Sequence, residues 1–349
     1  MITELARKGD FEGIKKIFEL SFTEEYARRE VDIVRRIEKI ASLYPLVKTL
    51  SLFPNPYQHL FTVHVARMEQ DIAGMAQMSP RNALETRWHV DNIAVHPDFR
   101  GQGIARRLLD EVFQYYVDRG ALRFTLEVDT TNAPAIKLYE KLGFRRYSTL
   151  YYHKMSPKRL GAFRDLEELS VPEGLRLRKL GDDEDLLELY EQSIPQHIRN
   201  VEDRVLRDFH NGLLTHGTRW LKKSLKRSQH MHWVVEDTQR NCLVASMDVS
   251  AQLRALPHVI QMTVNPGYSD LTEPLLKFVL HQLALIRINP VLIGAFESQR
   301  VKRDAVKALG FKKLTADFLM VKEAMERIVI PTAEKSVELG QVQGKPSLQ

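Results

Sequence analysis

The chain has 349 residues, so two domains are expected, and its 44% hydrophobic content argues for packed cores rather than a disordered protein. A single cysteine, Cys242, excludes an internal disulfide, and no cysteine and histidine residues have the spacing of metal ligands, so we expect no bound metal. No apolar run approaches a membrane span, and charges interrupt the first residues where a signal peptide needs an apolar core. We expect a cytoplasmic protein without a membrane partner.

The formal net charge is +6, but 51 basic residues are mixed with 45 acidic ones. The densest basic stretch is residues 219–227, whose helical spacing places Trp220, Leu221 and Leu225 inward and the lysines outward, as in a solvated helix face. The charge pattern therefore argues against a nucleic-acid partner.

In chain order, residues 3–7 are predicted to form a strand, and residues 10–22 and 23–44 two helices that break at Phe22-Thr23, with Thr23 as the cap. Strands are predicted at residues 60–67, 72–77 and 88–95. A helix from Ile104 follows, then a strand at 122–128, a helix that begins after Asn132, and a closing strand at 146–155.

The most informative segment is residues 92–105, in which an apolar strand ends at His-Pro and a glycine-containing loop precedes an amphipathic helix. A helix N-terminus offers unpaired N–H groups and a partial positive charge to an anion. Gly101 and Gly103 let the backbone approach a phosphate closely. The segment is neither the dinucleotide-binding G-x-G-x-x-G pattern nor a P-loop ending in G-K-[ST]. It predicts a different phosphate-bearing cofactor.

Arg100-x-x-Gly103-x-Ala105 resembles the (Q/R)-x-x-G-x-(G/A) loop of the GCN5-related N-acetyltransferase (GNAT) superfamily. Residues 132–144 resemble that family's second signature, N-x-x-A-x-x-L-Y-x-x-x-G-F. The resemblance covers residues 1–155 and implies acetyl-coenzyme A as co-substrate, with no metal. It also implies that the sheet splays after residues 88–95 to admit the pantetheine arm. The implied cofactor-binding residues are Ile93, Ala94, Val95, Arg100, Gly101, Gln102, Gly103, Ile104, Ala105 and Asn132.

The resemblance also implies catalytic roles. Tyr139 matches the tyrosine that protonates the departing sulfur, with a buried core tyrosine as the alternative. Asn132 would contact pantetheine or only cap its helix. A backbone N–H at a bulge near Asn92-Ile93 would polarise the thioester carbonyl. Eleven residues before Arg100, where some members have a base, stands His89. Asp91 is two positions further on, on the same predicted strand face, and Glu127 is on the neighbouring strand. His89 is either a base or an exposed strand residue.

Three blocks of the first half recur 167 to 172 residues later, around Gly181, Val264 and Gly310. We therefore expect an α/β protein of two tandem GNAT-like domains, each a mixed sheet flanked by helices. The expected boundaries are a catalytic domain at 1–155, a linker at 156–173, a degenerate second domain at 174–325 and a disordered tail at 326–349. The second copy has lost the chemistry, because the positions of Arg100, Gly101, Gly103, Ala105, Asn132 and Tyr139 hold Ser269, Asp270, Thr272, Pro274, Gln299 and Val306.

The predicted function is acetyl-coenzyme A-dependent N-acetylation of a primary amine, on a small molecule or a peptide or protein N-terminus. The alternative is a non-catalytic acyl-coenzyme A sensor that responds by altered packing of its two domains. Either is compatible with a monomer or a homodimer.

Overall fold

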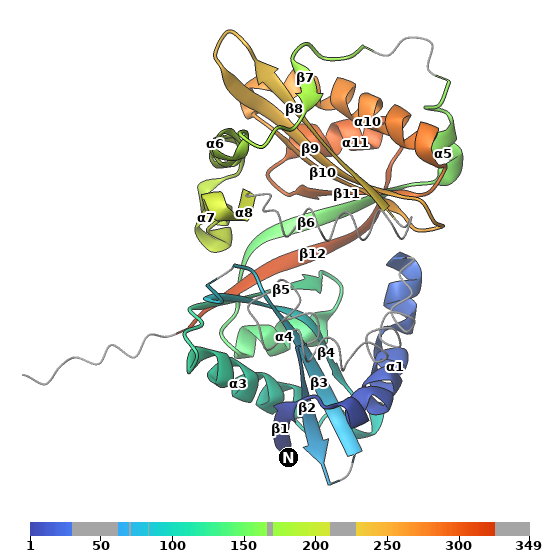
Figure 1. Cartoon of the computed structure of the whole chain (residues 1–349). Helices are drawn as coiled ribbons and strands as arrows, with labels where there is room; N and C mark the ends of the chain where they lie inside the picture. The colour runs from blue at the N-terminus through green and yellow to red at the C-terminus, as the bar shows by residue number, and fades with distance from the viewer. Residues whose placement is uncertain (30–61, 70, 83, 166–169, 210–227, 325–349) are drawn as a thin grey trace, which may run out of the picture.

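The computed structural model describes residues 1–29, 62–69, 71–82, 84–165, 170–209 and 228–324, and it joins the strands of both halves into one twelve-stranded mixed sheet with helices on its faces (Figure 1). The predicted mixed α/β class is confirmed. The sheet is continuous across the two halves, where the sequence had predicted one sheet for each. The strand order is β1-β2-β3-β4-β5-β12-β6-β11-β10-β9-β8-β7.

Apart from the second of the two predicted early helices, the described elements of the first half follow the predicted order. They are β1 (Ile2–Leu5), α1 (Phe11–Arg29), β2 (Val63–Met68), β3 (Asp71–Pro80), β4 (Arg87–Val95), α3 (Ile104–Val117), β5 (Arg123–Asp129), α4 (Ala133–Lys141) and β6 (Arg145–Met155). The predicted break at Phe22-Thr23 is wrong, because α1 runs through it without interruption. No glycine or proline follows Gly13 within this helix, so nothing in its backbone forces an end there. Residues 30–44, the rest of the predicted second helix, lie outside the described residues.

The second half repeats this order after a short helix. Its elements are α5 (Pro157–Gly161), β7 (Leu175–Leu177), α6 (Asp183–Ser193), α7 (Gln196–Glu202), α8 (Leu206–Phe209), β8 (Ser228–Asp237), β9 (Cys242–Gln252), β10 (His258–Val264), α10 (Thr272–Ile286), β11 (Val291–Phe296), α11 (Arg300–Ala308) and β12 (Lys312–Glu323). The basic stretch at residues 219–227 and the predicted tail at residues 326–349 lie outside the described residues. In the described part of the chain, no helix has both the length and the apolar character needed to cross a bilayer.

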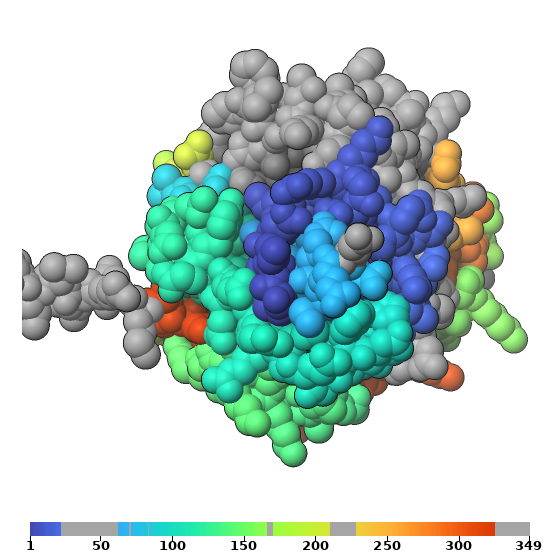
Figure 2. All heavy atoms as spheres, turned by 90° about the horizontal axis from the view of Figure 1, so that it is seen from below, coloured from blue at the N-terminus to red at the C-terminus, as the bar shows by residue number. Residues whose placement is uncertain are grey.

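The last strand of each half is exchanged into the sheet of the other. β12 pairs antiparallel with all seven residues of β5, from Asp129 opposite Asp317 to Arg123 opposite Glu323. β6 pairs antiparallel with β11, and β6 and β12 pair with each other at the centre of the sheet (Figure 1). In Figure 2, which views the molecule from below, the red atoms of β12 emerge beside the teal atoms of the first half. One edge of β5 is therefore hydrogen-bonded to the last strand of the second half.

The cores are exchanged in the same way. Met320 of β12 is buried in the core cluster that α3 forms with β5, and Met155, Leu160 and Phe163 are buried in the core of the second half. The predicted linker therefore begins with α5, a helix capped by Ser156 whose Leu160 is fully buried. The domain boundaries stay a prediction, but the packing makes each half incomplete without the other.

A fragment of residues 1–165 expressed alone should be much less stable than the whole chain. It would lack the ladder along β5 and the burial of Met320, a side chain worth about 1.5–3 kcal/mol, against a typical total of only about 5–15 kcal/mol. Thermal unfolding followed by circular dichroism checks this, and adding residues 170–349 should restore the transition. A fragment that melts within a few degrees of the whole chain would contradict the exchange.

Candidate functional site

A gap opens in the sheet of the first half where two parallel strands separate. β4 and β5 pair over only four residues, ending at Val90 opposite Leu126. Beyond that point the edge of β4 from Asp91 to Val95 is no longer paired with β5, although β3 still covers its other edge. The sequence predicted this separation from the resemblance. It leaves backbone polar groups of β4 available to a ligand that enters between the strands.

A bulge lies at the start of this gap. In the pairing of β3 with β4, Gln77 is opposite Asn92 and Met78 is opposite Val90, so Asp91 is the skipped residue. This is one position before the bulge that was expected at Asn92-Ile93. The exposed Asp91 carboxylate accepts a hydrogen bond from Ser79 Oγ (3.0 Å), and its Oδ1 lies 3.7 Å from the Arg81 guanidinium. Bulges commonly re-aim side chains beside functional sites.

The loop after β4 has the backbone of an anion cradle. A short 3₁₀ turn, Pro97–Phe99, follows His96, and Gly101 and Gly103 then have φ values of +78° and +73°. A Cβ added to either glycine would meet no atom within 4 Å, so the space beside the loop is open. Gly103 is the N-cap of α3, and no side chain caps this helix. The first-turn N–H groups of α3 are therefore available to an anion.

Arginine side chains fix the position of the loop and give its surroundings a positive charge. Arg100 Nε donates to the carbonyl of Val95 (3.2 Å), and its guanidinium donates to Ser21 Oγ (3.4 Å), which ties the loop to β4 and α1. The first turn of α3 contains Arg106 and Arg107 and no acidic residue. The donor set, open backbone and charge fit a pyrophosphate.

The second signature forms α4, which follows β5. Asn132 is its N-cap and accepts a hydrogen bond from the Ala135 N–H (3.2 Å), so the capping role is observed. β12 supports this turn, because Thr315 Oγ1 donates to Asp129 and the Thr130 N–H donates to the Ala316 carbonyl. Tyr139 is buried, with its ring 5.9 Å from that of Phe144 in an edge-on arrangement. Of the other predicted cofactor residues, Ile93, Ala94 and Val95 lie on β4 beyond its last pair with β5, and Arg100 to Gly103 lie in the loop. Ile104 and Ala105 begin α3, where the side chain of Ile104 is buried in the core, so these two could contact a ligand only through their backbone.

His89 is buried, so the predicted alternative of an exposed strand residue is wrong. Its Nδ1 lies 2.9 Å from Thr125 Oγ1 on β5, and burial together with the charge of Arg81 holds the pKa of His89 well below its ordinary value. It is therefore neutral at pH 7 and a weak proton acceptor. His89 and Asp91 were predicted to share one face of the strand, because side chains alternate along a regular strand. The bulge at Asp91 interrupts this alternation, and Asp91 is exposed while His89 is buried.

Glu127 has a more favourable position than the sequence alone indicated. It is the first residue of β5 beyond the last pair with β4, and its side chain is exposed. Its Oε2 accepts a hydrogen bond from the Tyr152 hydroxyl of β6 (2.7 Å). Asp91 and Glu127 therefore stand at the first separated position of each strand. The pairing register, which the sequence does not give, is the signal that identifies Glu127. Among the described residues, no three acidic, histidine or cysteine side chains form a metal site.

The second half has the corresponding gap but a different loop. β10 and β11 pair from His258 with Val291 to Ile260 with Ile293 and then separate. The loop after β10 is a 3₁₀ helix, Pro266–Leu271, and none of its residues has a positive φ. Asp270 and Glu273 place negative charge where an anion would lie. Val306 of α11 is fully buried at the position that matches Tyr139 and has no proton to donate.

Lys302 of α11 occupies the second gap. Its Nζ donates to the carbonyl of Met262 (2.8 Å), which belongs to the part of β10 that has separated from β11. By the repeat offset, the matching residue in the first half is Ala135, whose side chain cannot reach across. Burial alone lowers the pKa of the Lys302 ammonium to about 7. The second gap is thus filled by a side chain of the protein itself.

Comparisons with known proteins agree with this geometry. Residues 11–144 match the model of the acetyltransferase (GNAT) family. A streptothricin acetyltransferase of Streptomyces lavendulae is 40% identical over 74 residues, which are 21% of this chain and 39% of that protein. The ribosomal protein bS18-alanine N-acetyltransferase of Escherichia coli K12 is 49% identical over 53 residues, 15% of this chain and 36% of the relative. The chain thus matches less than half the length of these relatives.

A solved structure extends the likeness in fold to both halves. The GCN5-related N-acetyltransferase of Sphaerobacter thermophilus superimposes with a TM-score of 0.60 over 92% of this chain and 95% of that one, at 15% identity. At this identity the likeness concerns the fold alone.

Replacing Lys302 with methionine should change the pH dependence of stability. The pKa of Lys302 is about 7 in the folded chain and 10.5 in the unfolded one, so between these values the unfolded state binds more protons and the stability of the parent rises with pH. Methionine has no such proton. The difference in free energy of unfolding, Lys302→Met minus parent, should therefore be larger at pH 7 than at pH 10, because only the parent gains stability over this range.

Urea unfolding at the two pH values measures this difference. Lys277→Met is the control, because Lys277 is an exposed lysine of α10 that pairs with Glu273. A Lys302→Met difference that is the same at pH 7 and pH 10 would show that the ammonium is not enclosed.

Proposed function

Since residues 11–144 make the chain a member of the GNAT superfamily, we propose that its first half is an N-acetyltransferase that transfers the acetyl group of acetyl-coenzyme A to a primary amine. The observation that carries the proposal is the convergence of two features at the same end of β4. The strands separate after Val90, and β4 is followed by a short loop with positive-φ glycines that leads into a helix N-terminus without a side-chain cap. A long cofactor with a pyrophosphate at one end and a reactive thioester at the other matches both.

The residues that would hold the cofactor follow from this arrangement. The amides from Arg100 to Ala105 would bind the pyrophosphate at the positive end of α3. The edge of β4 from Ile93 to Val95, which no longer pairs with β5, would bind the pantetheine arm through backbone groups, and Asn132 would border it. Acetyl-coenzyme A supplies the activated acetyl group. The proposed acetyl transfer requires no metal ion, because the thioester already activates the acetyl group.

Acetyl transfer requires a neutral amine, a polarised carbonyl and a proton for the leaving sulfur. As the amine nitrogen bonds to the acetyl carbon, the carbon–sulfur bond breaks, the nitrogen gives up a proton to a base and the sulfur takes one from an acid. Backbone N–H groups at the bulge at Asp91 would polarise the carbonyl. Tyr139 would donate the proton to the sulfur.

We assign the base to Glu127 rather than to His89. Glu127 is exposed at the point where the strands separate, whereas His89 is buried and its pKa is lowered further by Arg81. Asp91 would attract the ammonium form of the acceptor from the other strand. His89 would then be a positioning residue, since its contact with Thr125 joins β4 to β5 just before the gap.

The second half would bind no cofactor of its own. Lys302 fills its gap, its loop lacks the positive-φ backbone, and acidic side chains stand near its helix N-terminus. Its proposed role is to complete the sheet and to border the acceptor side of the first half. The relatives support both acceptor types, because one is named for the antibiotic streptothricin and the other for a ribosomal-protein alanine.

Two substitutions should separate cofactor binding from turnover. Gly103→Asp places a side chain in the positive-φ position and a negative charge beside the pyrophosphate, so acetyl-coenzyme A should no longer raise the melting temperature. Tyr139→Phe should keep that rise and lower the rate of coenzyme A release by about 10²-fold or more. Differential scanning fluorimetry and a thiol-release assay with amines, amino acids, polyamines, aminoglycosides and N-terminal peptides measure the two effects.

Gly120→Asp is the matched control for the first substitution, because Gly120 also has a positive φ and open space but lies at the far end of α3. Equal loss of binding and turnover in Tyr139→Phe would contradict its acid role. Cofactor binding without turnover on any amine would favour the sensor, and no thermal shift in the parent protein would refute both.

A further inference from the structure

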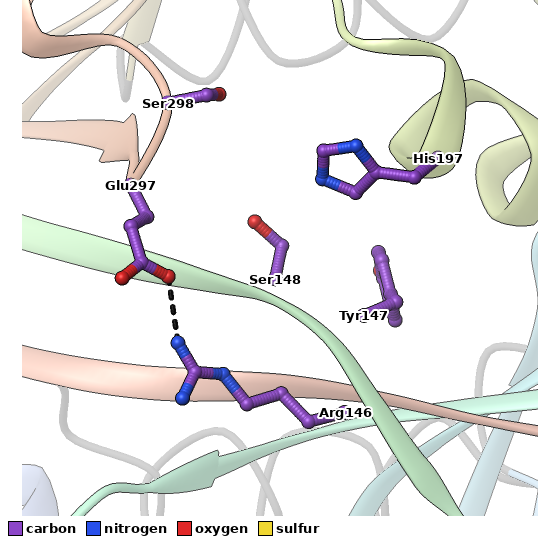
Figure 3. A pocket seen from close by; sticks show the side chains of 6 residues that line it. All are labelled: Arg146, Tyr147, Ser148, His197, Glu297 and Ser298. Carbon is purple, nitrogen blue, oxygen red and sulfur yellow. Dashed lines mark hydrogen bonds and ion pairs between the residues drawn. The ribbon is translucent and has the colours of Figure 1, made fainter.

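A cavity of about 370 Å³ lies at the seam between the two halves. It is lined by Arg146, Tyr147 and Ser148 of β6, by His197 of α7, and by Glu297 and Ser298 after β11 (Figure 3). In the close-up, the side chains of Ser148 on β6 and His197 on α7 extend into the same space. First-half and second-half elements thus build it jointly.

The cavity lies close to the proposed reaction centre. Glu127 of β5 is opposite Leu319 of β12, which is opposite Ser148 of β6, so the three residues form one row across the sheet. Two strand spacings separate the ends of this row, about 10 Å. The register of β6 with β12 skips Tyr147, which is therefore a bulge beside the cavity. Burial raises the pKa of Tyr147, and the charges of Glu202 and Glu127 raise it further, so this phenol lies near the carboxylate assigned as base.

The polar groups of the cavity are available for hydrogen bonding. Within the described part of the chain, the side chains of Ser148, His197 and Ser298 have no hydrogen-bond partner, although Ser148 is only 6% exposed. Arg146 and Glu297 form an ion pair with each other (2.6 Å), so the charges of the lining cancel. Hydroxyl and imidazole side chains offer both donors and acceptors, which suits the N–H and C=O groups of amides better than a polycation or polyanion.

The wall from the second half is held firmly against the first half. The Arg123 guanidinium of β5 donates to the carbonyls of Asn200 and Val201 at the end of α7, both at 2.8 Å. Arg87 of β4 forms an ion pair with Asp208 of α8 (3.2 Å). These contacts fix α7, and with it His197, relative to the strands that separate at the gap.

We propose that this seam cavity is the acceptor subsite of the enzyme and that the acceptor is a peptide N-terminus. The inference rests on the proposed function. With the amine at Glu127, an extended peptide advances about 3.3 Å per residue, so its third residue reaches the row position of Ser148. Its backbone amides then hydrogen-bond Ser148, His197 and Ser298. The second half thereby selects the acceptor while the first half performs the transfer.

The test compares a tripeptide amide with a single-residue amide in the coenzyme A release assay. The parent protein should have the higher kcat/KM for the tripeptide. The double variant His197→Ala/Ser298→Ala should lose about tenfold in kcat/KM for the tripeptide, as expected for two hydrogen bonds, and should leave the single-residue amide unchanged. His230→Ala/Ser269→Ala removes the same residue types elsewhere in the second half and should leave both rates unchanged.

Equal losses on both substrates, or no loss on either, would overturn the subsite while leaving the proposed function intact. A selective loss on an aminoglycoside or polyamine but not on the tripeptide would overturn the peptide assignment. If none of the amines tested causes release of coenzyme A, the proposed function is refuted, and the subsite with it.

Discussion

The pairing of β12 with β5 is the contact on which the rest of the structure depends. It supplies the second edge of the strand that carries Glu127, it supports the turn before Asn132 through Thr315 and Ala316, and it buries Met320 in the core below α3. β6 makes the reciprocal contribution by pairing with β11. Because each half lends its last strand to the other, the two halves form one continuous sheet. A site built on β4 and β5 is therefore supported by residues almost 200 positions away.

The exchange also explains how one backbone plan can serve two purposes. Both halves separate their parallel strands at the same point, but their side chains differ at the gap. Ala135 leaves the first gap open, while Lys302 spans the second and donates to Met262. Gly103 permits a left-handed cap, while the matching Thr272 is helical and buried. The second half keeps the scaffold and contributes α7 and the β11 loop to the seam.

The sequence predicted features that are encoded locally. The glycine loop, the cap at Asn132 and the order of elements each depend on residues close together in the chain, and the structure has all three apart from the predicted helix break at Phe22-Thr23. Features that depend on distant partners were missed. No local pattern indicates that β6 pairs with β11, that the bulge falls at Asp91, or that Thr125 and neighbouring strands bury His89. Glu127 lies on an alternating strand like any other exposed residue, and only the register shows that it is the first to leave β4.

The central claim is that the exchanged sheet contains two gaps of which one binds coenzyme A. Isothermal titration of the full chain with coenzyme A, in the absence of an acceptor, tests it most directly. The account predicts one site per chain, abolished by Gly103→Asp and unaffected by Asp270→Ala in the second loop. Two sites per chain, or a single site that survives Gly103→Asp, would contradict it.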